Sequence, residues 1–171
     1  MSYKSVDVLD LFPHKTFTPC VGKPNKVFLD RLQEKLTENL ASVPSSLGGG
    51  QHGLSGLLLP LAKYHLDTGC HFLDPVFPGD TADTTLAANV AEERRMIATF
   101  MSAMGNFQTT TKAYCAVRNM LYEVIDEMYL AALKVPITGL SNVPIRDIMQ
   151  HLFDEHGHVT SIKKTQAEQD A

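Results

Sequence analysis

A long stretch without proline is the feature that most constrains how this chain folds. From Asp83 to Lys134 the sequence has no proline and a single glycine, Gly105. Proline removes a backbone hydrogen bond and glycine costs conformational entropy, so a stretch almost free of both favours helix. Its apolar residues recur at helical spacing in two stripes: Leu86, Val90, Ile97, Phe100, Met101 and Met104, then Tyr114, Val117, Leu121, Ile125, Met128 and Leu133.

This stretch is predicted to form two long helices that bury these two stripes. The predicted break is Gly105-Asn106, because glycine ends a helix at little cost. The threonines at 109–111 follow it, and threonine is a favourable residue for capping the start of the next helix.

Shorter helices are predicted on either side. Apolar residues at three- and four-residue spacing indicate a helix at about 26–41, and a short helix follows Pro60. Another begins after Pro144 and ends at Gly157, and Thr160 or Ser161 caps a last short polar helix. Residues 1–24 carry Pro13, Pro19 and Pro24, which favour an extended arm.

The predicted fold is therefore mainly α, with about five to six helices, an N-terminal extended arm and loops rich in glycine and proline. The loops at 43–53 and 67–81 separate the helices. We divide the chain into the arm at 1–24, a helical lobe at 25–81 and a second helical lobe at 82–171, with a single helical body as the other arrangement.

The composition excludes several classes of function. Fifteen Lys and Arg against nineteen Asp and Glu give a net charge of −4, and the basic residues occur singly or in pairs, so no nucleic-acid patch is visible. Three distant cysteines, Cys20, Cys70 and Cys115, suggest neither a disulfide framework nor a zinc site. No signal peptide or membrane span is recognisable, so we expect a protein of the reducing cytoplasm.

No pattern of residues points to catalysis or to a cofactor. The loop Gly48-Gly49-Gly50-Gln51-His52-Gly53 lacks the Gly-Lys-Ser/Thr of a phosphate-binding loop, which leaves a structural loop as the better interpretation. His151, His156 and His158 lie close in sequence, but helix capping explains their positions better than metal binding does. An enzyme that uses His52 as acid and base is the least favoured hypothesis.

Several short motifs occur in an order that carries more information than any one of them. They are Leu11-Phe12-Pro13-His14, Thr18-Pro19, Gly22-Lys23-Pro24, Gly48-Gly49-Gly50-x-His52-Gly53-x-x-Gly56, Phe72-x-x-Pro75-x-x-Pro78-Gly79 and His151-Leu152-Phe153-x-x-x-Gly157-x-Val159-Thr160. In this order they resemble the Gag-like capsid proteins of Ty1/copia-type LTR retrotransposons. The chain departs from that pattern at Leu54-Ser55, where a His-like position is common, and at His156, where the family has tyrosine.

The resemblance implies a structural role: a shell subunit that associates with copies of itself around element RNA in the cytoplasm. It implies no small-molecule substrate, no cofactor and no membrane partner, and RNA contact only indirectly or through a C-terminal region not present in this sequence. The alternative hypothesis is a helical adaptor or scaffold that binds a host protein, including a domesticated Gag. The candidate assembly contacts are Leu11, Phe12, Phe17, Phe72, Phe77, Met149 and Phe153.

Overall fold

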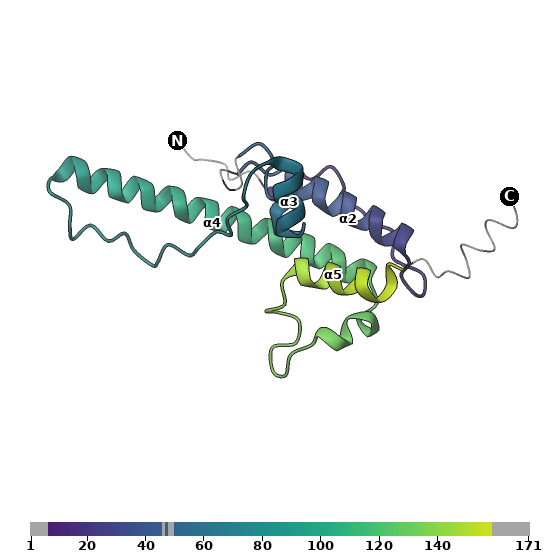
Figure 1. Ribbon diagram of the computed structural model, residues 1–171. Helices are drawn as coiled ribbons and strands as arrows, with labels where there is room; N and C mark the ends of the chain where they lie inside the picture. Colours follow the sequence, from purple (N-terminus) through teal and green to yellow (C-terminus); the bar gives the residue numbers. More distant parts are fainter. Residues whose placement is uncertain (1–6, 46, 48–49, 159–171) are drawn as a thin grey trace, which may run out of the picture.

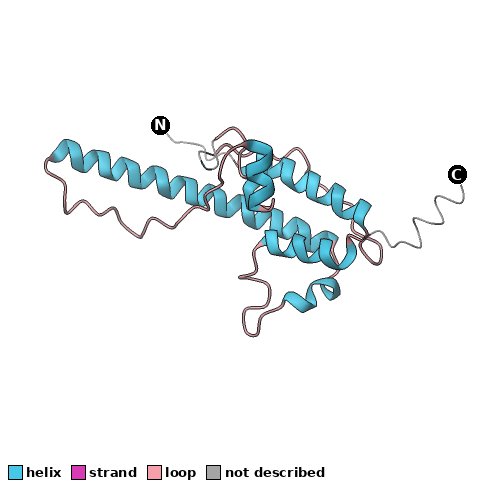
Figure 2. Ribbon diagram, viewed as in Figure 1, coloured by secondary structure: helices cyan, strands magenta, loops and turns pink. Residues whose placement is uncertain are grey.

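The computed structural model describes residues 7–45, 47 and 50–158, and these residues are mainly helical. Within them the α-helices are α1 (Val8–Leu11), α2 (Lys26–Ala41), α3 (Leu61–Thr68), α4 (Val90–Val124) and α5 (Ile145–His156), and the 3-10 helices are η2 (Ser55–Leu57) and η3 (Glu127–Leu133). Helices dominate the ribbon and no strand is drawn in the described part (Figure 2). The mainly α prediction is confirmed. Gly48, Gly49 and the helix predicted after Thr160 lie outside the described residues.

Helices α2 and α5 begin where the sequence predicts. The side chain of Asn25 caps α2 by accepting a hydrogen bond of 2.9 Å from the Phe28 N–H, which satisfies one of the free amides of the first turn. Pro144 precedes α5, and Gly157 ends it with a φ of −85°, so this glycine is not in the left-handed region.

Helix α4 corrects the prediction of two helices, because it runs unbroken for 35 residues through Gly105. The hydroxyls of Thr110 and Thr111 donate to the carbonyls of Asn106 and Phe107, at 2.7 and 2.9 Å, inside the same helix. They therefore do not cap a second one. A glycine inside a helix costs only about 1 kcal/mol relative to alanine, whereas a break would leave several backbone groups of each new end without partners.

The second half of α4 lies at the centre of the molecule (Figure 1). It packs against α1 and α2, while α2 also packs against α5 and η2. The buried hydrophobic residues form one cluster with members from residue 8 to residue 152, so they come from all three predicted segments. The division into two helical lobes at 25–81 and 82–171 stays a prediction.

The N-terminal arm is less extended than predicted, because Val8–Leu11 forms a helical turn capped by Asp7. Beyond α1 the arm has no regular structure up to α2 and is fastened by buried Asn39 of α2. The side-chain oxygen of Asn39 accepts from the His14 N–H at 2.9 Å, and its amide donates to the His14 carbonyl at 2.8 Å. Further along, the Cys20 N–H donates to the carbonyl of Val124 at 2.8 Å.

Candidate assembly surface

Two glycines of the Gly48–Gly56 motif, Gly53 and Gly56, occupy positions where a side chain does not fit. Gly53 has a φ of +53°, and a Cβ atom placed on it would lie 2.4 Å from the carbonyl oxygen of Ala41. A Cβ atom on Gly56 would lie 2.2 Å from the ring of Phe72. His52 is half-buried and meets Tyr64 edge to face, with the ring centroids 6.4 Å apart. This part of the motif therefore joins α2 to α3 by close packing.

Arg146 of α5 fastens the same loop from the other side. Its guanidinium donates to the carbonyl of Leu59 at 2.9 Å and to that of Gly56, and it lies 4.0 Å from the carboxylate of Asp74. Arg146 was not among the site residues predicted from the sequence. An arginine between the apolar residues of a helix gives no indication of its partner, which is 87 residues away in sequence.

Tyr114 connects α4 to the start of α5. Its hydroxyl oxygen accepts a hydrogen bond of 2.9 Å from the Ile145 N–H. Burial raises the pKa of Tyr114, although this hydrogen bond and the charge of Arg118 lower it. The phenol therefore stays neutral and acts as a structural acceptor.

The histidines at the end of α5 do not gather into a metal site. The ring of His156 meets Tyr129 edge to face at 5.3 Å, and its Nδ1 atom is buried without a hydrogen-bond partner in the described structure. Burial lowers the pKa of His156, which favours a neutral ring over the cation expected of a helix cap. Across residues 7–45, 47 and 50–158, no group of three or more His, Cys, Asp or Glu side chains could hold a metal ion.

The candidate assembly contacts divide into three groups by burial. Phe12, Phe72 and Met149 are buried in the hydrophobic core, so a partner cannot reach them in this fold. Phe17 and Phe153 are half-buried, whereas Leu11 and Phe77 are exposed. Of the remaining motif residues, Pro75, Pro78, Gly79, His151 and Gly157 are half-buried and Leu152 is buried.

A long exposed helical surface was not among the candidates. The first half of α4 projects from the rest of the molecule, and from Val90 to Thr109 it contains no buried residue (Figure 1). Val90, Ile97 and Met101 are 62%, 38% and 66% exposed. These residues were expected in the core. A helical stripe in the sequence reveals which residues share a face and does not reveal whether another element covers that face.

A single loop runs beside this half of α4, and we call residues 73–89 the strap. The rings of Phe77 and Phe107 lie 5.5 Å apart. Pro78 and Asp83 of the strap, with Met96, Phe100 and other α4 residues, line a shallow cavity of about 390 Å³. The strap therefore covers one side of the projecting half and leaves the rest accessible.

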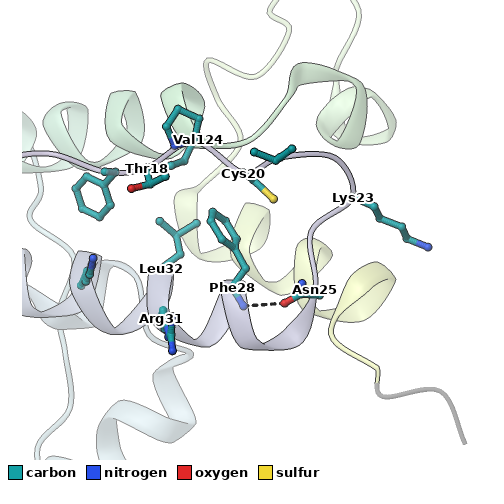
Figure 3. Close-up of a pocket in the computed structure, with 12 residues that line it drawn as sticks. Thr18, Cys20, Lys23, Asn25, Phe28, Arg31, Leu32 and Val124 are labelled. Atoms are coloured by element: carbon teal, nitrogen blue, oxygen red, sulfur yellow. Dashed lines mark hydrogen bonds between the residues drawn. The ribbon is translucent and has the colours of Figure 1, made fainter. Parts of the chain in front are cut away.

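A second hollow lies between the arm and α2 (Figure 3). Its volume is about 420 Å³, and Lys23, Arg31 and Lys35 line it together with Phe17 and Phe28. Phe28 and Leu32 point toward the arm, whereas Lys23 extends away from the pocket. Lys35 lies 6.0 Å from the centroid of Phe17. These cations do not converge on one point, so the pocket offers an apolar floor with a basic rim and no paired acid and base.

None of the described helices is long and apolar enough to cross a lipid bilayer. Comparisons with protein-family models, with curated proteins and with solved structures found no match to this chain.

Proposed function

We propose that this chain is a structural assembly domain of the capsid type, similar to the Gag shell proteins of Ty1/copia-like retrotransposons. The observation that carries the proposal is the distribution of exposed apolar side chains over separate places on a helical body. They lie on α1 (Leu9, Leu11), on the strap (Leu73, Val76, Phe77), on the first half of α4 (Val90, Ile97, Met101) and in the turn after η3 (Val135, Ile137).

Exposed apolar surface of this kind marks interaction sites, and several sites on one subunit are what a closed shell requires. Each contact can be weak, since many weak contacts add up when every subunit is held by several neighbours. The resemblance of the ordered motif set to Gag-like capsid proteins supports the same proposal. Two glycines of that set, Gly53 and Gly56, lie in tightly packed positions between helices.

The proposal assigns neither catalysis nor a cofactor to the chain and places its assembly in the cytoplasm. Its partner is another copy of itself. Because the net charge is −4, RNA contact is assigned to a region outside this sequence or to an indirect role.

The adaptor hypothesis differs in the number of surfaces that it needs. A one-to-one complex with a host protein requires one interface, whereas the exposed apolar residues lie in several places. We therefore retain the adaptor as the second candidate. A pull-down that returns a host protein in a fixed one-to-one ratio would favour it.

The test is light scattering and negative-stain electron microscopy on the full chain, over a range of protein and salt concentrations, with and without RNA. We expect a mass that rises with concentration and regular particles, sheets or rings at the upper end. A chain that stays monomeric at high concentration, under crowding and with RNA would contradict the proposal.

A further inference from the structure

We propose that the projecting half of α4 is a dimerisation element, which pairs antiparallel with the same segment of a second copy about a two-fold axis at Met101. This inference deepens the proposed function, because it names one of the assembly contacts. It rests on a row of α4 residues that share one side of the helix: Val90, Arg94, Ile97, Met101, Gly105, Gln108 and Lys112.

Every residue of this row is exposed. The spacing of three and four residues keeps the row on one line, and at about 1.5 Å per residue it extends for about 33 Å. Phe77 of the strap contacts Phe107, and the strap lines a cavity together with Met96 and Ala103. These three α4 residues lie on the other side of the helix from the row. The row is thus open to a partner from Val90 to Gln108, whereas Lys112 at its end lines a hollow together with Val8 and Leu9 of α1.

The sizes of the side chains in the row match when two copies run antiparallel. With Met101 opposite itself, Ile97 of one copy lies opposite Gly105 of the other. Gly105 has open space where a Cβ atom would be, with no atom within 4 Å, so it can receive the isoleucine. Close helix packing uses such pairs of large and small residues.

The charges of the row favour the same arrangement. In the antiparallel pair Arg94 lies opposite Gln108 of the other copy, whereas a parallel pair would set Arg94 against Arg94 and Lys112 against Lys112. Lys112 of one copy also reaches the turn that carries Glu93 of the other. Neither Glu93 nor Lys112 forms an ion pair within the described residues, so both are available.

The expected dimer is weak. A helix about 10 Å across, in contact along about 33 Å, buries a few hundred Å² on each copy, below the roughly 800 Å² per partner of a standard interface. Such a contact dissociates readily on its own and becomes stable when other contacts of a shell hold the same subunits.

Disulfide cross-linking tests the register. In the full chain with Cys20, Cys70 and Cys115 replaced by alanine, we would introduce Met101→Cys, Ile97→Cys or Gly105→Cys and oxidise mildly. Leu66→Cys, at an exposed position on α3 that belongs to none of the proposed assembly sites, gives the level of random collision. We expect Met101→Cys to cross-link with itself, and Ile97→Cys to cross-link with Gly105→Cys when the two proteins are mixed.

Ile97→Cys should not cross-link with itself above the Leu66→Cys level. In the antiparallel pair the two copies of residue 97 are about 12 Å apart along the axis, and a disulfide needs Cα atoms within about 7 Å. Self-linking of Ile97→Cys would indicate a parallel pair and would overturn the proposal, as would the failure of all three variants to cross-link above the control.

A second measurement does not depend on the cysteine-free background. Sedimentation equilibrium of Met101→Lys in the native chain should show at least a tenfold weaker self-association, while Leu66→Lys, at an exposed position on α3, should match the native chain. Equal association of Met101→Lys and the native chain would overturn the proposal. If particles form but α4 does not cross-link, the capsid proposal stands and the α4 contact is excluded. If α4 cross-links but particles never form, the α4 contact stands and the capsid proposal is excluded.

Discussion

At the scale of single residues, the structure assigns a packing role to Gly53 and Gly56 of the motif and gives Gly105 a different one. Gly53 and Gly56 lie against a backbone carbonyl and an aromatic ring, where a methyl group has no room. Gly105 lies in the middle of α4 with open space around it. The same residue type is thus required at two positions and only tolerated at a third.

Replacing these glycines by alanine should have opposite effects on stability. Gly56→Ala forces a methyl group into the ring of Phe72, and we expect a loss of about 1–3 kcal/mol in the free energy of unfolding. Gly105→Ala should add about 0.5–1 kcal/mol, since alanine loses less entropy in a helix. Urea unfolding at low protein concentration measures both changes in the free energy of unfolding. Equal changes for the two variants would contradict the close contact between Gly56 and Phe72.

Two half-buried tyrosines, Tyr114 and Tyr122, form another matched pair. Tyr114→Phe removes the acceptor of the Ile145 N–H and should cost about 1–3 kcal/mol, because that amide then lacks a partner. Tyr122 carries a buried hydroxyl with no hydrogen-bond partner in the described structure, so Tyr122→Phe should be neutral or slightly stabilising. Thermal unfolding distinguishes the two variants, and an unchanged Tm for Tyr114→Phe would contradict the link between α4 and α5.

At the scale of elements, α4 is one helix with two environments. Its second half carries the buried residues Ala113, Val117, Met120 and Leu121, whereas its first half has the strap on one side and exposed residues elsewhere. Most of the stability of a helix in a protein comes from packing of its apolar face. The two halves should therefore differ in stability although they share one backbone.

Hydrogen exchange measures this difference directly. In dilute protein, the amides between Ile97 and Met104 should exchange much faster than those between Val117 and Leu121, because fewer contacts oppose local opening. If α4 pairs with a second copy, the first group should become more protected as the concentration rises and the second should not change. Equal protection of the two halves in dilute protein would contradict the contrast in packing.

At the scale of the whole molecule, the environment of His156 joins distant parts of the chain. Its ring lies against Tyr129 of η3, and the charges of Lys23 in the arm and of His151 lower its pKa, while Glu155 raises it. Burial is the largest cause of the lowered pKa. Protonation of His156 is therefore easier in the unfolded chain than in the folded one.

The free energy of unfolding should consequently decrease as the pH is lowered through the mildly acidic range. A histidine whose pKa is lower in the folded state takes up its proton in the unfolded state first, so stability decreases as the pH drops below the ordinary value near 6.5 and levels off below the folded pKa. His156→Phe should flatten this dependence between pH 7 and pH 5. Urea unfolding across this range makes the comparison, and an unchanged slope in His156→Phe would contradict the assignment.

The sequence by itself determined the helices that have local signals. The apolar spacing and the cap at Asn25 define α2, and Pro144 and Gly157 bracket α5, because caps and periodicity act over a few residues. The tertiary structure alone decided that α4 runs through Gly105, that Phe12, Phe72 and Met149 are buried, and that Val90, Ile97 and Met101 are exposed. Burial depends on which elements meet in space, and a helical stripe looks the same in the sequence whether or not another element covers it.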